Sequence, residues 1–150
     1  MRILSFGKTA PAILARQKTV TRRDWADKYG RSFSDGEVLQ AWDTSPRTGK
    51  GQKIGEICLT ARPYLESSRP PLADVEQTRE GFAFLSEYHG NCDLVDAILE
   101  DWRAKPREVW VVRFDYLWTV CVACGRPVPA NPGTDPEYTT SRGLIACSRR

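Results

Sequence analysis

Two cysteines in the last third of the sequence have a spacing that binds zinc in ribbons and fingers. Cys121 and Cys124 are separated by two residues, and Gly125 follows them directly. Cys147 is the candidate third ligand. A structural zinc site usually needs four ligands, and the fourth would come from a second chain or from His89, Cys92 or Asp135. The alternative is a degenerate knuckle that holds no metal.

A second group of reactive side chains lies in residues 18–23, which combine cations with hydroxyls. Lys18, Arg22 and Arg23 alternate with threonines, among them Thr21. In an extended conformation this segment suits contacts with the phosphates or bases of RNA or single-stranded DNA. An exposed sheet edge with ordinary solvated charges would show the same pattern, so both interpretations stay open.

Aromatic side chains further along the sequence could stack on a nucleobase. The candidates are Trp25 and Trp42, although such residues more often close a hydrophobic core. His89 is the only histidine. Nothing beside it suggests a catalytic triad, so we expect it at the surface. Cys58 lies in a predicted strand and is expected to be a small core residue.

The composition limits the classes of protein that can carry these groups. The 150 residues are 41% hydrophobic and 27% charged, which is typical of one globular domain. No apolar run reaches the ~18 residues that cross a bilayer, so we expect no membrane partner. The net charge of +3 permits a nucleic-acid ligand but lacks the basic stripe of a duplex binder. The start does not resemble a signal peptide and the five cysteines are an odd number, which favours a cytoplasmic protein with thiols or metal ligands over a disulfide frame.

The periodicity of apolar residues predicts a mixed α+β domain. The clearest elements are a helix that begins at Asp93 and a strand over residues 108–118 with apolar side chains on both faces. Shorter strands are expected over residues 2–6, 18–23, 37–43 and 53–62, and helices over 9–17 and 73–80. Thr9 is the expected cap of the first helix, and residues 63–72 should be irregular because of their prolines. Strands scattered among short helices predict a curled sheet or a small barrel.

The composition changes from Cys121 onward. Prolines and glycines become frequent, which predicts an irregular C-terminal tail. We place the boundary near residue 118, with a domain over residues 1–118 and a Cys-containing tail over 119–150.

The segment Ile13-Leu14-Ala15-Arg16-Gln17-Lys18-Thr19-Val20-Thr21-Arg22-Arg23 resembles the signature of the ASCH domain (activating signal cointegrator homology). The resemblance continues over residues 51–59, 80–82 and 108–116, and spans about residues 2–118. The family motif is a Gly, one residue, a Lys, four residues and an Arg. Lys18 and Arg23 match it, whereas Arg16 stands where the Gly is usual. Arg tolerates a left-handed conformation less well than Gly, so this departure bears on the backbone at the helix end.

The resemblance implies a fold and an activity. ASCH domains are similar to the PUA domain, a small β-barrel flanked by short helices, and have a cleft that accepts RNA or a modified nucleoside. One branch of the family consists of small bacterial amidohydrolases that remove the acetyl group of N(4)-acetylcytidine. Their catalytic Lys, the Thr three residues later and a distant Glu match Lys18, Thr21 and Glu80. Glu76 and Glu87 lie nearby, and any of the three glutamates could instead be a solvated residue on a helix.

The residue types suit amide hydrolysis without a cofactor. A Thr hydroxyl becomes an effective nucleophile when a base takes its proton, and Lys18 could serve if burial lowers its pKa. Glu80 could orient that Lys or carry a proton to the leaving amine, and Arg23 could hold the developing oxyanion. The geometry raises an objection, because residues three apart on a regular strand face opposite sides. Lys18 and Thr21 can share a cleft only if the chain bends between them.

Three functions therefore stay open at the level of sequence. The first is an amidohydrolase acting on acetylated cytidine. The second is a non-catalytic RNA- or DNA-binding module, in which Arg22, Arg23 and Trp25 contact phosphates or bases. The third is an adaptor whose cysteine tail docks a protein partner. Family membership is the firmer expectation, because a shared fold does not fix function.

Overall fold

The computed structural model describes residues 1–120, 127–129, 138–141 and 144–147. They belong to two compact units, Met1–Asp115 and Tyr116–Arg150. In the second unit, β7 (Trp118–Val120) pairs with β8 (Pro127–Pro129), and β9 (Tyr138–Ser141) pairs with β10 (Leu144–Cys147); both pairs are antiparallel. The prediction of an irregular tail is therefore wrong for these segments, because they form paired strands, and β8 does so with a proline at each end.

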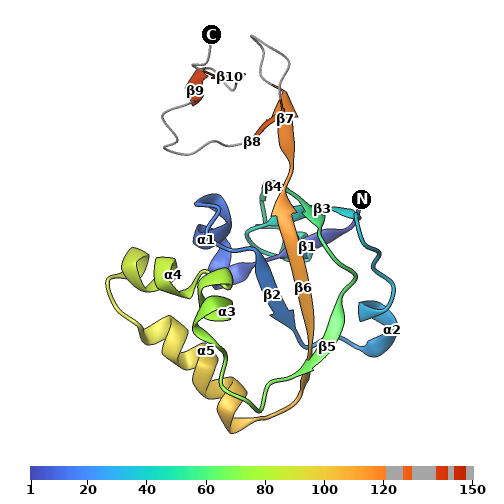
Figure 1. The fold of residues 1–150 in the computed structure, drawn as a ribbon, viewed down its shortest axis with the longest axis vertical. Coiled ribbons are helices and arrows are strands. Elements are labelled where there is room, and N and C mark those ends of the chain that lie inside the picture. The colour runs from blue at the N-terminus through green and yellow to red at the C-terminus, as the bar shows by residue number, and fades with distance from the viewer. Residues whose placement is uncertain (121–126, 130–137, 142–143, 148–150) are drawn as a thin grey trace. The chain divides into compact units, whose positions relative to one another are not determined.

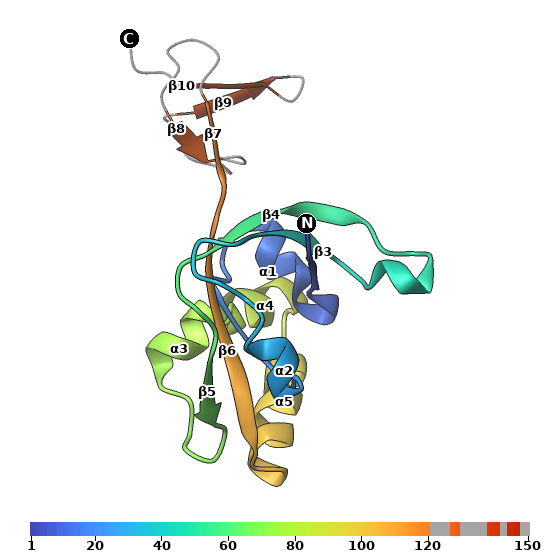
Figure 2. The same ribbon diagram turned by 90° about the vertical axis from the view of Figure 1, so that its right-hand side faces the viewer.

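The first unit is an α+β fold built on a curled, mixed six-stranded sheet (Figure 1). Its strands are β1 (Ile3–Ser5), β2 (Val20–Arg23), β3 (Val38–Trp42), β4 (Lys53–Leu59), β5 (Tyr64–Ser67) and β6 (Glu108–Tyr116). The order is β1-β3-β4-β6-β2, and β5 also pairs with β6. β1 and β3 are parallel, whereas the pairs β3–β4, β2–β6 and β5–β6 are antiparallel. The β3–β4 hairpin curls over α1 at one end of the unit (Figure 2).

β6 is the central strand of this sheet. Its consecutive residues Val109, Trp110, Val111 and Val112 are all buried, as is Phe114, so the strand is covered on both faces as its sequence predicts. Gly30 lies against one of these side chains, because a Cβ added there would be 2.2 Å from the Trp110 ring.

Helices form a second layer, and most of them gather on one side of β2 and β6 (Figure 1). The α-helices are α1 (Ala10–Leu14), α2 (Asp27–Gly30), α3 (Asp74–Arg79), α4 (Phe82–His89) and α5 (Asp93–Ala104), and short 3-10 turns occur at Gly7–Thr9 and Pro46–Thr48. Ala12 of α1, Phe82 and Leu85 of α4 and Val95 of α5 form a buried cluster. This cluster fixes α1 against the two helices that follow the candidate Glu80.

The sequence predicted most of these elements and missed β5 and the helices α2 and α4. The helix from Asp93, the helix near residues 73–80 and the strands near 2–6, 37–43, 53–62 and 108–118 are confirmed. β5 corrects the expectation that residues 63–72 are irregular, and α4 was not predicted. The predicted helix over 9–17 is shorter, and the Thr9 side chain does not cap it but donates a 2.8 Å hydrogen bond to the carbonyl oxygen of Phe6. In the described part of the chain, no helix has the length and apolar character that a bilayer span requires.

Candidate functional site

The site begins at the C-terminal end of α1, where the chain turns sharply. Arg16 has φ +56°, and its amide donates to the Ile13 carbonyl at 3.0 Å. The Gln17 amide donates to the Ala12 carbonyl at 2.8 Å, which completes a Schellman motif with Arg16 at its left-handed position. Arg16 therefore adopts the conformation in which Gly is usual, at a cost in backbone energy that Gly would avoid.

This turn sends Lys18 into the interior, opposite the end of α3. The Thr19 amide donates to the Arg79 carbonyl at 2.8 Å and fixes the segment there. The Lys18 ammonium donates to the Glu80 carboxylate at 2.5 Å and to the Glu80 carbonyl at 3.0 Å. Lys18 is 1% exposed and Glu80 is 2% exposed, so the ion pair is shielded from water.

Gly81 makes this close approach possible. Its φ is +81°, and a Cβ added there would be 2.8 Å from the Ala12 Cβ and 3.2 Å from the Gln17 carbonyl oxygen. A side chain at this position would push α1 away from the start of α4 and disturb the contact between Lys18 and Glu80. Three consecutive residues thus have different roles. Glu80 supplies the buried carboxylate, Gly81 allows the close approach of α1, and Phe82 packs in the core.

Thr21 reaches the same place from β2. The strand begins only at Val20, after the turn, and Thr21 pairs with Val112 of β6. Lys18, Thr21 and Glu80 line one cavity of about 140 Å³, together with Arg22 and Arg23. The objection from strand geometry therefore does not apply, because Lys18 precedes the regular strand. We call this space the reaction cavity.

Arg22 holds the other side of the Glu80 carboxylate. Its guanidinium donates to Glu80 Oε1 at 2.9 Å, to Glu76 Oε2 at 2.8 Å and to Glu66 Oε2 at 3.1 Å. Because Lys18 contacts Oε2 of Glu80 and Arg22 contacts Oε1, both carboxylate oxygens are fixed. The Arg22 side chain is 3% exposed, so its charge is used within the protein.

Glu76 connects this cluster to the sheet. Burial alone would raise the pKa of Glu76, but hydrogen bonds from Arg22, Arg79 and Arg113 outweigh burial and lower the pKa to about 2. Glu76 is therefore ionised at neutral pH, and it anchors Arg22 on the side away from Glu80.

Arg23 has one terminal nitrogen with a partner and a buried Nε without one among the described residues. That terminal nitrogen donates to the Ser5 carbonyl at 2.6 Å. Burial lowers the pKa of Arg23, and the side chain lines the reaction cavity.

Lys18 is the group in the cavity best suited to act as a base. Burial lowers the pKa of its ammonium, and the positive charges of Arg23 and Arg22 act in the same direction. The attraction of Glu80 opposes this shift without cancelling it. A lysine whose pKa is lowered has a larger neutral fraction near pH 7, and only the neutral amine can accept a proton.

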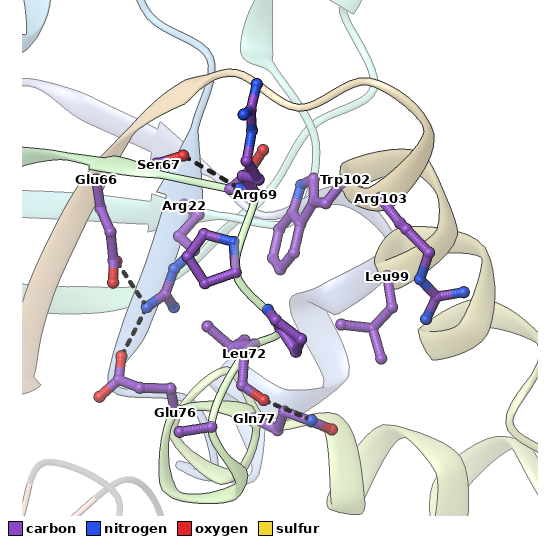
Figure 3. A pocket seen from close by; sticks show the side chains of 14 residues that line it. Arg22, Glu66, Ser67, Arg69, Leu72, Glu76, Gln77, Leu99, Trp102 and Arg103 are labelled. Carbon is purple, nitrogen blue, oxygen red and sulfur yellow. Dashed lines mark hydrogen bonds and ion pairs between the residues drawn. The ribbon is translucent and has the colours of Figure 1, made fainter.

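A larger groove adjoins the reaction cavity and shares Arg22 and Trp102 with it. Its volume is about 390 Å³. Arg22, Glu66 and Glu76 lie on one side of this groove, and Trp102, Leu99 and Arg103 lie on the other (Figure 3). Trp102 comes from α5, where its position in the apolar pattern indicated only a core residue.

Several candidate residues lie elsewhere. Trp25 stacks on Phe33 with ring centroids 5.0 Å apart, and the Trp42 indole donates to Gln40. Neither lines the reaction cavity or the groove, so the interpretation as packing residues fits both. His89 is exposed, as expected.

The candidate zinc ligands cannot be placed by this structure. Cys121 and Cys124 and the side chain of Cys147 lie outside the described residues, as does Asp135. Cys92 is exposed, and Cys58 is half-buried rather than a full core residue. Within the described residues no three His, Cys, Asp or Glu side chains gather at a metal-binding distance.

The sequence did not reveal two parts of this site. Glu76 lies one helical turn before Glu80 on α3, a spacing that could have indicated a shared face. Trp102 closes a helical apolar stripe, and nothing local distinguishes it from its neighbours. Comparison of the chain with known proteins adds no further assignment, because no family model, curated protein or solved structure matches it.

Proposed function

We propose that the first unit is a PUA-like domain of the ASCH type that hydrolyses the acetyl amide of N(4)-acetylated cytidine. The observation that carries the proposal is the buried Lys18–Glu80 ion pair in one cavity with the Thr21 hydroxyl. A base with a lowered pKa, a hydroxyl and an orienting carboxylate are the groups that this reaction needs.

In the first step, the neutral Lys18 amine takes the proton of the Thr21 hydroxyl. The oxygen attacks the acetyl carbonyl carbon, and the carbonyl oxygen becomes an oxyanion. Arg23 lines the cavity, and we assign its guanidinium to this oxyanion. The bond from carbon to the cytosine amine then breaks, and the amine leaves with the proton from Lys18. An acetyl ester on Thr21 remains.

In the second step, water hydrolyses the ester. Lys18 takes a proton from the water, the hydroxide attacks the ester carbon, and the Thr21 oxygen leaves and regains a proton from Lys18. The products are acetate and cytidine. Glu80 contacts Lys18 but not the reacting atoms, so we assign it as a positioning residue that holds the amine in place.

The size of the reaction cavity suits the acetylated edge of the base rather than the whole nucleoside. At about 140 Å³ it is smaller than the ~300 Å³ at which pockets for whole small molecules begin. It accommodates an acetyl group and the edge of a pyrimidine, while the sugar lies outside. Phe6, Phe82 and Trp102 supply apolar surface for the acetyl methyl and the base.

The burial of Lys18 and the ion pairs of Arg22 favour this function over a non-catalytic nucleic-acid module. That alternative needs the cations of residues 18–23 to face phosphates. Arg22 is instead bound by carboxylates, and Lys18 is buried. The adaptor hypothesis stays a prediction, because the cysteines on which it depends lie outside the described residues.

The test is turnover of acetylcytidine by the full-length protein, followed by chromatography. Thr21→Val removes the hydroxyl with little change of shape, and we expect it to lower kcat by at least about a thousandfold, whereas Thr21→Ser retains measurable turnover. Thr19→Val is the matched control, since Thr19 does not line the cavity. Turnover that persists in Thr21→Val would remove this residue from the mechanism, and no turnover by folded wild-type protein would overturn the proposed activity.

The pH dependence provides a separate test of the base. Because the pKa of Lys18 is lowered below 10.5, kcat/KM should rise with pH and reach its plateau below that value. Lys18→Arg keeps a cation that cannot be deprotonated in this range, so turnover should be lost at every pH. A circular dichroism spectrum of the variant controls for folding.

A further inference from the structure

The groove beside the reaction cavity has no role in the chemistry proposed above. Its volume of about 390 Å³ lies within the range of pockets that take small ligands. It shares Arg22 and Trp102 with the reaction cavity, so the two spaces adjoin each other. A nucleoside whose acetylated base occupies the reaction cavity would extend its sugar toward this groove.

One wall of the groove suits a flat ring. Trp102 and Leu99 from α5 lie near Leu72 (Figure 3), and Pro70 and Pro71 from the segment that follows β5 also line the groove. An indole and proline rings present flat apolar surfaces, and bases stack on such surfaces with little dependence on sequence. The wall thus favours an aromatic heterocycle over a flexible chain.

The rim of the groove is positively charged. Arg69 and Arg103 are both exposed there, and Arg103 forms a surface ion pair with Glu100. The two carboxylates of the groove, Glu66 and Glu76, are both bound to Arg22. The Arg103–Glu100 pair is exposed to solvent and therefore weak, so an anion can compete with Glu100 for this guanidinium. A flat ring with an attached anion describes a nucleotide.

We propose that this groove binds the nucleotide adjacent to the acetylated cytidine in a single RNA strand. Its base stacks on Trp102, and Arg69 and Arg103 contact the phosphodiester. This inference rests on the proposed function, and it specifies the substrate as a strand rather than a free nucleoside.

The experiment compares two substrates of the same protein. One is free acetylcytidine, and the other is a trinucleotide with acetylcytidine between two adenosines. We expect kcat/KM to be at least about tenfold higher for the trinucleotide. In the double variant Arg69→Gln/Arg103→Gln the ratio of the two kcat/KM values should fall toward one. The double variant Arg31→Gln/Arg47→Gln removes the same charge from exposed positions outside the groove and should leave the ratio unchanged.

Binding of the trinucleotide to the Thr21→Val protein separates this inference from the proposed chemistry. Fluorescence anisotropy should show weaker binding when Arg69 and Arg103 are both replaced, and the slope of log K against log salt should fall by ~0.7 for each lost phosphate contact. If kcat/KM is equal for the two substrates, or if the preference does not depend on these arginines, the groove does not bind the adjacent nucleotide. The proposed hydrolase activity would be unaffected by that result. If no acetylcytidine is hydrolysed but binding of the trinucleotide depends on both arginines, the proposed hydrolysis is wrong. The assignment of the groove as a nucleotide-binding site would then still hold.

Discussion

The reaction cavity and the groove share two residues but hold their charges in opposite ways. In the cavity, Lys18 and Glu80 are almost completely buried, and Arg22 is fixed by three carboxylates. At the groove rim, Arg69 and Arg103 extend from the surface. Fixed groups suit a reaction that needs one geometry, whereas exposed arginines suit a flexible strand that is held by its charge.

The difference also has an energetic meaning. A buried ion pair loses its hydration, and apolar side chains of similar volume would often stabilise a protein equally well. Burial of Lys18 and Glu80 is therefore poorly explained by stability alone. Perturbed charges in a cavity are instead typical of sites that carry out chemistry.

The largest effect is expected from breaking the buried pair. Glu80→Ala removes the carboxylate that Lys18 and Arg22 share, so the free energy of unfolding should fall by about 3–5 kcal/mol. Glu66→Ala removes a carboxylate from the groove side, where the side chain is 44% exposed, and should cost less than about 1 kcal/mol. Urea denaturation measures both. Equal losses would mean that the two regions do not differ as described.

A smaller effect is expected where the cavity depends on close backbone approach. Gly81→Ala combines a positive φ with a collision against Ala12, so we expect a loss of about 2–4 kcal/mol. Gly90→Ala is the matched control, because Gly90 has φ +71° but no atom within 4 Å of the added Cβ. Its loss should be about 1–2 kcal/mol, from the backbone alone. A loss at Gly81 no larger than at Gly90 would show that α1 can move away without cost.

Glu76 links the two regions, and its ionisation should make the free energy of unfolding depend on pH. Its pKa is about 2 in the folded protein against 4.5 in the unfolded chain, so the folded state binds fewer protons between these values. The stabilisation is complete above about pH 5 and is lost as pH falls from 4.5 to 2. Glu76→Gln should lower stability at pH 7 by about 1.5–3 kcal/mol and flatten the decline toward pH 3.

Chemical denaturation at pH 7 and pH 3 measures this difference. Glu87→Gln, at an exposed position on α4, controls for the removal of one carboxylate. A decline with acid that is equally steep in Glu76→Gln and in the wild type would assign the acid sensitivity to other groups.

These contrasts also explain what the sequence could and could not predict. β6 and α5 were predicted because their apolar residues repeat along long segments. α4 was missed because it begins at a glycine rather than a capping residue, and its apolar side chains do not keep to one face. β5 was missed because Pro63 and Pro70 flank it, although the strand itself contains no proline.

The candidate site was accessible to sequence analysis only in part. From residue types alone, residues 18–23 could equally be an exposed sheet edge. Only the family resemblance singled out Lys18, Thr21 and Glu80 as catalytic candidates. The burial of Lys18 depends on a partner 62 residues away, and no local pattern contains that information. The groove was missed for the same reason, since Trp102 and Arg69 come from segments that meet only in the folded chain.

The smallest effect is expected at Arg16, which forms the turn into the cavity. Arg16→Gly and Arg16→Ala both remove the side chain, so their difference isolates the cost of φ +56° at a residue with a Cβ. The Gly variant should be more stable than the Ala variant by about 1 kcal/mol, as measured by urea denaturation. If Ala equals Gly, the left-handed turn is not strained, and the Schellman hydrogen bonds of Arg16 and Gln17 alone are enough to direct Lys18 inward.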